Sequence, residues 1–468
     1  MSRGKQLVKN TAIVAVGRIC TKMLAFILLP FYTAVLSQQE YGIVDLFNTF
    51  TSLMIPVVVF QMEDAVFRFL IEIREDELQK RKLLSTTILF AFMQCVLFFA
   101  VFFLITRWVS IPYGAFLLGN ILVTIFSGLF LQLARGLGDN IGYAIGSFIT
   151  AAATILLNII LVLIMKMGVE GMFISIFFSN LLTVIYIFIK EKVFSYIRLD
   201  AFSFAELKKV LSYSFPLIPN YLCWWILGAS DKSIVTAFLG LSANGILAVA
   251  QKFSTAYTTM YSVFNLTWTE NAAMHLKDQD SERYFSDIIE KAFRILSCMC
   301  MGVVAIVAVF FPVLVNENFA EAYNQIPIYM LSAFLYSTIG IFSVVYIACK
   351  MTGKIAKTSF SAAAINLVVN LSLIQWIGLY AASISSVAAY AVLLAIRYYD
   401  IQKYLKVRIS KKTILSVCFA MTGTFVVYYI RDNLLSAILL AGIVIFSLCF
   451  NRAIMKEAVQ MLKSRWKK

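Results

Sequence analysis

Apolar runs as long as a lipid bilayer is thick follow one another along this chain, separated by short polar segments. A helix needs about 20 apolar residues to cross the hydrocarbon layer. By this measure the chain carries about fourteen transmembrane helices. The first six lie at 10–36, 42–70, 83–106, 113–135, 144–166 and 169–189. The others lie at 211–238, 242–270, 290–315, 325–349, 357–377, 379–398, 412–430 and 433–451.

Two short motifs recur and divide these helices into halves. The segment 33–43 is echoed by 236–246, and the segment 168–175 is echoed by 378–385. Six is an even number of helices, so two six-helix copies keep the same orientation, and transporters commonly bind substrate between such copies. We therefore predict an all-α integral membrane protein with two pseudo-symmetric lobes. The predicted divisions are an N-lobe at 1–194, a C-lobe at 195–408, and two further helices with a basic tail at 409–468.

Composition and charge support a membrane protein and argue against a nucleic-acid partner. Of the 468 residues, 61% are hydrophobic, compared with about 45–50% in soluble domains. The formal net charge is +15, but most of the cations lie at the N-terminus, in the tail and in the loops after even-numbered helices. Arg397 is assigned to one of these loops. Under the positive-inside rule, this distribution puts both termini in the cytoplasm.

The residues needed for several kinds of chemistry are scarce. All eight cysteines fall in apolar runs without a CxxC pair, and His275 is the only histidine. We therefore expect no metal site, no cofactor and no histidine-based catalysis. The first apolar run is too long for a cleavable signal, and no loop predicted to be extracytoplasmic is large enough for a catalytic domain. These features favour a transporter over an enzyme.

Three cations are predicted near mid-membrane, where a charge costs about 2.5–3.5 kcal/mol. Arg18 and Lys22 are four residues apart in the first helix and share a face, and Lys252 comes from the second half. Cations that converge from both halves suit an anionic ligand such as a diphosphate. The alternative is that each pairs with an acid, or reaches the surface, in a purely structural role.

The stretch 224–252 carries further polar residues deep in an apolar hairpin. Asp231 lies in the outer half of its helix, where it either pairs with Lys252 or carries a coupling cation, Na⁺ or H⁺. Lys232 is adjacent and points another way. Trp224 and Trp225 lie far from either interface, so one of them either stacks on a sugar or serves as an ordinary core or lipid-facing aromatic.

A second group of charges lies nearer the cytoplasmic end of the membrane. Glu63, Asp64 and Arg68 belong to the second predicted helix, and Glu270 ends the eighth. We interpret them as a structural ion pair or as a gate closed by charges from facing halves.

These motifs resemble those of polysaccharide flippases. Asp231-Lys232, Leu239-Gly240, Gly245-Ile246, Ala250 and Lys252 follow the family's central signature, although the family often has tyrosine at the position of Ile246. The N-terminal pattern is also similar, with Gly17-Arg18, Leu29-Pro30 and Tyr41-Gly42. The family is the polysaccharide transport branch of the multidrug/oligosaccharidyl-lipid/polysaccharide exporter superfamily.

The resemblance implies a flippase of the bacterial inner membrane. Its substrate would be undecaprenyl-diphosphate-linked repeat units of O-antigen, capsule or exopolysaccharide, moved by alternating access through a cationic central cavity. Membrane lipid is the other expected partner, and association with glycan polymerase machinery is a further implication. A lipid II-type peptidoglycan precursor flippase, a multidrug or cation exporter and an integral-membrane glycan polymerase stay open as alternatives. The sugar composition and the oligomeric state are not specified by the sequence.

Overall fold

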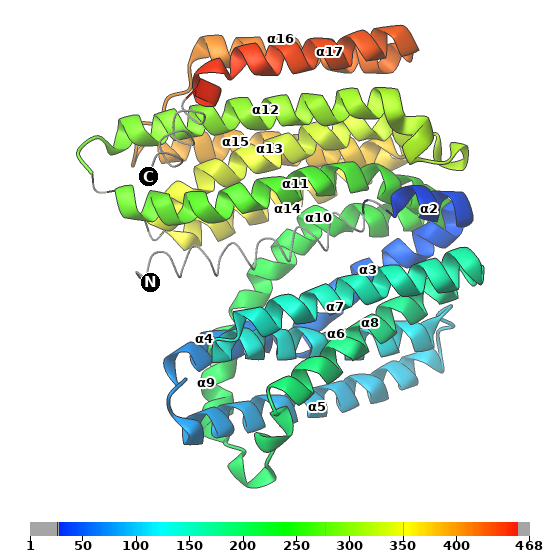
Figure 1. Ribbon diagram of the computed structural model, residues 1–468, viewed down its shortest axis with the longest axis vertical. Coiled ribbons are helices and arrows are strands. Elements are labelled where there is room, and N and C mark those ends of the chain that lie inside the picture. Colours follow the sequence, from blue (N-terminus) through cyan, green and yellow to red (C-terminus); the bar gives the residue numbers. More distant parts are fainter. Residues whose placement is uncertain (1–25, 27, 277, 350, 457–468) are drawn as a thin grey trace, which may run out of the picture. The chain divides into compact units, whose positions relative to one another are not determined.

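The computed structural model describes residues 26, 28–276, 278–349 and 351–456, and every regular element in this part of the chain is a helix (Figure 1). The chain divides into two compact units, Met1–Ala229 and Ser230–Lys468. Unit 1 therefore includes residues 195–229 in addition to the predicted N-lobe.

Unit 1 is built from long helices joined by short turns. Its elements are α2 (Leu29–Val35), α3 (Gln38–Val58), α4 (Met62–Glu72), α5 (Glu77–Thr106), α6 (Gly114–Leu137), α7 (Asn140–Asn158) with the π-helix η1 (Ile159–Ile164), α8 (Gly168–Lys190), the 3₁₀ turns η2 (Val193–Ser195) and η3 (Leu199–Ala201), and α9 (Phe204–Ser214). The next helix, α10 (Leu217–Leu239), begins in unit 1 and ends in unit 2.

Unit 2 continues with longer helices. They are α11 (Leu241–His275), α12 (Ser281–Leu314), the 3₁₀ turn η4 (Glu317–Phe319), α13 (Ala322–Ala348), α14 (Thr352–Ile377), α15 (Tyr380–Ile401), α16 (Lys411–Ile430) and α17 (Asn433–Phe450). Within this unit α11 packs against α13, and α14 and α13 both pack against α15.

Eleven helices among the described residues are long and apolar enough to cross a membrane. The number is twelve if the pair Phe204–Cys223 and Trp225–Leu239, which meet at 50°, forms one span. This confirms a polytopic all-α membrane protein. The first predicted run lies mostly outside the described residues, and α11, which is the eighth run, is not among the eleven. The count of fourteen and the cytoplasmic termini stay predictions.

The second predicted run is not one continuous helix. α3 ends at Val58, shortly after Pro56, and α4 starts at Met62. Between them Phe60 and Gln61 have φ of 52° and 57°, a left-handed conformation that is uncommon for residues other than glycine. The apolar pattern runs through this break, so hydrophobicity alone predicted a single helix.

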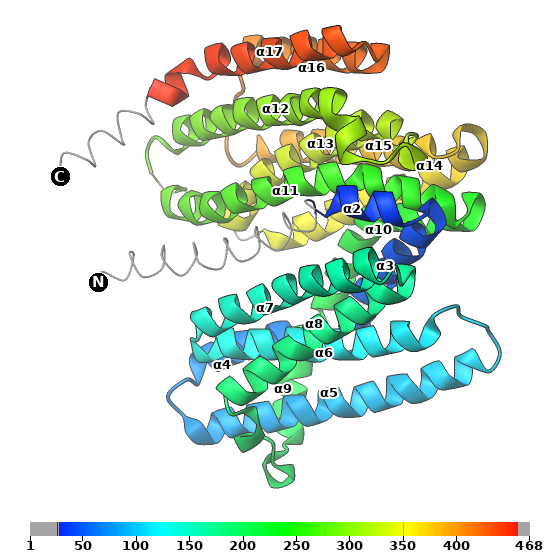
Figure 2. The ribbon, with the colours of Figure 1, turned by 45° about the vertical axis from the view of Figure 1, so that its right-hand side comes forward.

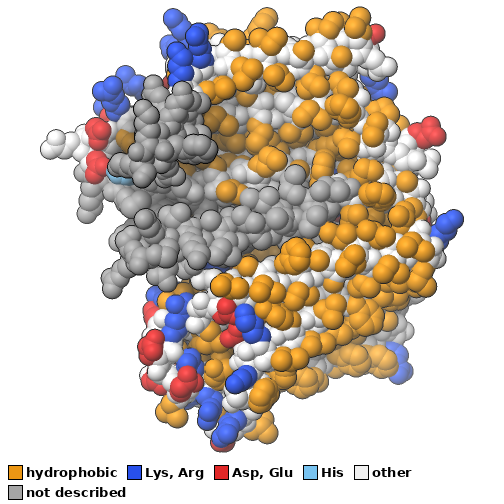
Figure 3. Space-filling view, viewed as in Figure 1, with side chains coloured by type: hydrophobic (Ala, Val, Ile, Leu, Met, Phe, Trp, Pro, Cys, Tyr) orange, Lys and Arg blue, Asp and Glu red, His pale blue; other side chains and the backbone are white. Residues whose placement is uncertain are grey.

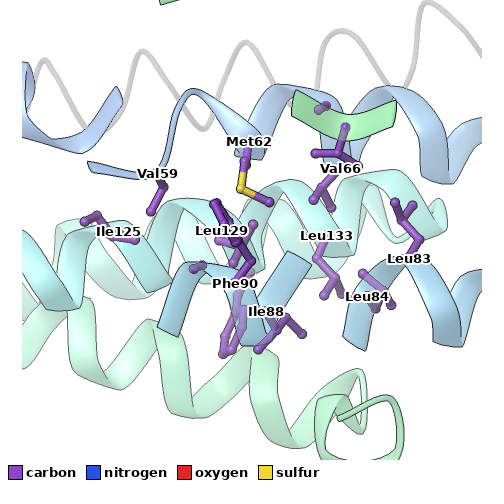
Figure 4. Packing of buried hydrophobic residues seen from close by; sticks show 14 of the residues in the cluster. Val59, Met62, Val66, Leu83, Leu84, Ile88, Phe90, Ile125, Leu129 and Leu133 are labelled. Atoms are coloured by element: carbon purple, nitrogen blue, oxygen red, sulfur yellow. The ribbon is translucent and has the colours of Figure 1, made fainter. Parts of the chain in front are cut away.

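The core of unit 1 lies where α4, α5 and α6 meet (Figure 4). Met62 and Val66 of α4, Leu84 of α5 and Leu133 of α6 are completely or almost completely buried. On the face that Figure 3 shows, the surface of unit 1 is largely apolar, and most of its charged side chains gather at one end. This is the distribution expected when lipid surrounds the middle of a protein and water its ends.

The assignment of Arg397 to a loop is wrong. Arg397 lies inside α15 with only 1% of its surface exposed. Its guanidinium donates to the hydroxyls of Ser343, Thr358 and Ser359 and to the carbonyl oxygen of Ile355. These four acceptors belong to α13 and α14, so Arg397 joins three helices and is not a loop cation.

The close approach of α4 and α6 depends on Gly136. A Cβ atom at this position would lie 2.8 Å from two side-chain carbons of Leu70. We expect Gly136→Ala to destabilise the protein by about 1–3 kcal/mol, because overpacking forces neighbouring atoms to move. Thermal unfolding in detergent micelles measures this.

Gly302 provides a matched control, since a Cβ there would meet nothing within 4 Å. Gly302→Ala should unfold no earlier than the parent, because alanine favours helix over glycine by about 1 kcal/mol. Equal unfolding temperatures for the two variants would contradict the packing argument.

Candidate functional site: a buried carboxylate in unit 2

Asp231 lies in α10 and is held by two other helices of unit 2. Only 2% of its surface is exposed. The Asn370 side-chain amide on α14 donates to Oδ1 at 2.8 Å, and the Ser386 hydroxyl on α15 donates to Oδ2 at 2.8 Å. Each carboxylate oxygen therefore has one donor, supplied by a different helix.

A second layer of polar groups surrounds this carboxylate. Asn366 lies one helical turn before Asn370 on α14, so both side chains are on one face. Its amide oxygen accepts from the Ser230 hydroxyl at 3.2 Å. Its amide nitrogen lies 3.3 Å from the Ser385 hydroxyl and 3.4 Å from that of Ser386. All four of these residues are buried.

The hydrogen-bond donors of Asp231 are neutral. No ion pair within the described part of the chain includes this carboxylate, and both of its hydrogen-bond donors are uncharged. An ionised carboxylate buried in a membrane protein is costly unless a cation or a proton compensates it. The arrangement thus favours a group that takes up a cation or a proton.

The surrounding oxygen atoms suit a hard cation. The Asn370 side-chain oxygen is buried and has no hydrogen-bond partner in the part of the chain that the structure describes. Carboxylate, amide and hydroxyl oxygens are the ligands that Na⁺-like and other hard cations use. The same carboxylate can hold a proton, so this geometry accommodates either ion.

The cations predicted to bind substrate are only partly placed. Arg18 and Lys22 lie outside the described residues. Lys252 lies in α11, half-buried, and forms no ion pair with any acid that the structure describes. Asp231 therefore takes the neutral partners described above and not Lys252. Lys232 follows Asp231 directly in α10. The diphosphate pocket stays a prediction.

The two tryptophans are placed differently. The indole N–H of Trp225 donates to the Thr49 carbonyl oxygen of α3 at 3.2 Å, within unit 1. The Tyr221 hydroxyl, one helical turn earlier, donates to the Ser52 carbonyl oxygen at 3.1 Å. Trp225 thus packs α10 against α3, and its proposed stacking on a sugar stays untested. The side chain of Trp224 lies outside the described part.

The predicted gate residues of unit 1 lie on the short helix α4. Arg68 forms an ion pair with Glu72 at 2.7 Å, and Asp64 accepts from the Gln61 side chain at 2.9 Å. Glu63 lies against Gly128 of α6, where a Cβ atom would be 2.7 Å from its carboxylate. The side chain of Glu270 lies outside the described part, so the gate stays a prediction.

The sequence pattern singles out Asp231 but not its neighbours Asn366, Asn370 and Ser386. One signal was present in the sequence. Two asparagines four residues apart in an otherwise apolar helix must share a face, and buried amides need partners. What the sequence does not reveal is that this face of α14 meets α10 and α15.

Known proteins share features with this chain in both sequence and fold. A family model described as "Polysaccharide biosynthesis protein" matches residues 7–268, and none of the curated proteins has a matching sequence. The solved structure of the lipid II flippase MurJ in an inward closed conformation has a TM-score of 0.69 and 15% identity, covering 96% of this chain and 100% of that one.

Two further solved structures share the fold. The inward-facing conformation of a multidrug resistance MATE family transporter of the MOP superfamily has a TM-score of 0.68 and 14% identity, covering 83% of this chain and 98% of that one. A MOP superfamily transporter from Pyrococcus furiosus has a TM-score of 0.53 and 14% identity, covering 85% and 96%. Identities this low establish the fold and not the substrate.

The donors around Asp231 give a prediction for stability. Asn370→Ala removes one of its two donors, and a hydrogen bond to a charged group contributes about 1.5–3 kcal/mol. We expect a loss of that size in the free energy of unfolding when the carboxylate is ionised. In an Asp231→Asn background the same substitution should cost less, which a double-mutant cycle measures.

Ser372→Ala is the control for this cycle. Ser372 is exposed on the same helix and donates only to its own backbone, at the Val368 carbonyl oxygen. Its loss should be small and the same in both backgrounds. An identical cost of Asn370→Ala with and without the Asp231 carboxylate would contradict the proposed contact.

Proposed function

The chain belongs to the polysaccharide biosynthesis protein family, whose model matches more than half of it, and on that premise we propose that it is a flippase for lipid-linked oligosaccharides. The substrate would be an undecaprenyl-diphosphate-linked repeat unit of O-antigen, capsule or exopolysaccharide. The membrane would be the bacterial inner membrane. Transport would proceed by alternating access, with delivery to glycan polymerase machinery on the far side, and the protein would perform no catalysis.

The family match is the observation that carries this proposal. The fold shared with the lipid II flippase MurJ supports it. Arg18, Lys22 and Lys252 supply the chemistry expected for a diphosphate, since cations paired with phosphate oxygens form strong hydrogen bonds.

Two other transport functions are found among proteins of this fold, and they compete with the proposed one. The likeness to MurJ favours a lipid II-type substrate as the second candidate. The likeness to MATE transporters favours organic cations as the third, but the predicted cavity cations would repel such substrates. Transport assays that offer each substrate class to the same preparation separate the three.

We propose in addition that Asp231 couples transport to an ion gradient. A buried carboxylate with neutral donors changes its interactions most when it gains or loses a cation, so its occupancy can bias one conformation of unit 2 over another. Na⁺ and H⁺ are both compatible with the oxygen-rich surroundings formed by Asn370 and Ser386. The structure of the carboxylate's environment supports this role, and transport measurements decide the ion.

The cationic site gives a direct test of the substrate. In a strain that depends on this protein, Arg18→Ala or Lys252→Ala should abolish glycan export while the protein still inserts in the membrane, because the diphosphate loses its counter-charge. Lipid-linked repeat units should accumulate on the cytoplasmic side. Extraction of the lipid and analysis of its sugars measure both the loss and the substrate.

The control is Arg283→Ala, which removes an exposed cation near the start of α12. This variant should export glycan at the parental rate. Parental export by both cavity variants would refute a cationic substrate site, whatever the identity of the glycan.

The coupling proposal is tested in liposomes with imposed gradients. Asp231→Asn preserves the shape of the side chain but removes its charge. An inward Na⁺ or H⁺ gradient should therefore no longer accelerate transport, while the slow transport measured without a gradient persists. Applying each gradient alone to the parent identifies the ion.

Glu317→Gln is the matched control, because Glu317 is an exposed carboxylate in η4. It should respond to the gradient as the parent does. If Asp231→Asn is folded and accelerated by the same gradient to the same extent, Asp231 is not the coupling site.

A further inference from the structure

The connection between α8 and α9 is fastened to α5 at a position that the length of α5 places inside the membrane. α5 has 30 residues and is therefore about 45 Å long, which matches a bilayer with its headgroups, about 40–45 Å thick. Ser85 and Thr86 lie about 12–14 Å from the start of this helix. Since the headgroup layer takes about 7 Å on each side, these residues lie about 5 Å beyond the hydrocarbon boundary.

Two hydroxyls of α5 satisfy the backbone of this connection. The Ser85 hydroxyl donates to the Tyr196 carbonyl oxygen and accepts from the Arg198 N–H at 3.2 Å. The Thr86 hydroxyl accepts from the Ser203 N–H at 3.0 Å. A loop in water needs no such partners, whereas irregular backbone at the edge of hydrocarbon must find them within the protein.

Large apolar side chains of the same connection are uncovered. Phe194, Leu199 and Phe204 are 61%, 81% and 79% exposed. They are not loosely held, because Val193 and Val210 are completely buried against unit 1. Both ribbon views show this connection beside the first half of α5 (Figures 1 and 2).

Cations alternate with these apolar side chains. Lys192, Arg198 and Lys208 are exposed, and their long stems can lie along hydrocarbon while the charged ends reach phosphate groups. Asp200 is an exposed acid in the same stretch, and Glu206 pairs with Lys209 at 3.8 Å. Apolar side chains with interspersed Lys and Arg are typical of segments that lie in the membrane interface.

We propose that residues 192–209, the interfacial segment, insert into the cytoplasmic leaflet of the bilayer. Phe194, Leu199 and Phe204 enter the upper acyl-chain region, and the neighbouring cations bind the phosphates of anionic lipids. The ligand is phospholipid, since the segment is fastened at a depth that a cytoplasmic protein does not reach. The interfacial segment thereby fixes the cytoplasmic end of unit 1 in one leaflet.

Spin labelling of the full chain tests this proposal. Leu199→Cys and Phe204→Cys are introduced singly into a protein whose native cysteines are replaced, labelled with a nitroxide and reconstituted in vesicles of phosphatidylethanolamine and phosphatidylglycerol. Collisions with oxygen, which concentrates in hydrocarbon, are compared with collisions with a water-soluble nickel chelate. We expect oxygen to dominate at both positions by several-fold.

The matched control is Asp278→Cys, in the exposed connection between α11 and α12. This label should collide mainly with the nickel chelate. Nickel accessibility at 199 and 204 equal to that at 278 would overturn the proposal and would indicate a surface left for a soluble protein. Chromatographic elution and unfolding temperature verify folding, and Phe194→Cys replaces any variant that fails. The result does not depend on transport activity, so it is independent of the proposed function.

Discussion

Polar groups that lie at membrane depth must find their partners inside the protein, and this constraint explains the most informative contacts in both units. In unit 2, Asn370 and Ser386 enclose the Asp231 carboxylate. In unit 1, Ser85 and Thr86 satisfy backbone groups of the neighbouring connection. Water would supply such partners in a soluble protein at little cost. In lipid each contact is required, and each one therefore defines how helices pack.

Much of the fold follows from local properties of the sequence, and these were predictable. A span is recognised from its own residues, so most of the apolar runs in the described part of the chain reappear as helices. The break between α3 and α4 was not predictable from hydrophobicity, because Phe60 and Gln61 lie within the apolar run while their φ angles are left-handed. Arg397 was misplaced for a related reason. Its four acceptors lie on α13 and α14, and no local pattern reveals them.

The candidate site shows the same division between local and tertiary information. Asp231 was detectable because a carboxylate in an apolar run is rare. Its partners come from positions more than 130 residues away, so their meeting depends on the packing of three helices. The repeated segments 168–175 and 378–385 show that similar sequences do not predict similar contacts. Ser175 donates only to its own helix, at Gly171, whereas its counterpart Ser385 also lies beside the Asn366 amide.

Arg397 and Asp231 are buried charges of unit 2 with different consequences. Arg397 carries a delocalised charge that stays protonated in proteins, and its four acceptors suit that one ionic state. Asp231 is smaller, has one donor for each oxygen, and lies beside the Asn370 amide oxygen that has no hydrogen-bond partner among the described residues. A proton or a metal cation changes the net charge of this group from −1 to zero or above, and the donors that suit the ionised carboxylate no longer suit it equally well. A structural charge is one whose environment suits a single ionic state, and a coupling charge is one whose environment leaves room for two. By this criterion Arg397 stabilises unit 2, and the surroundings of Asp231 suit the coupling role that we propose for it.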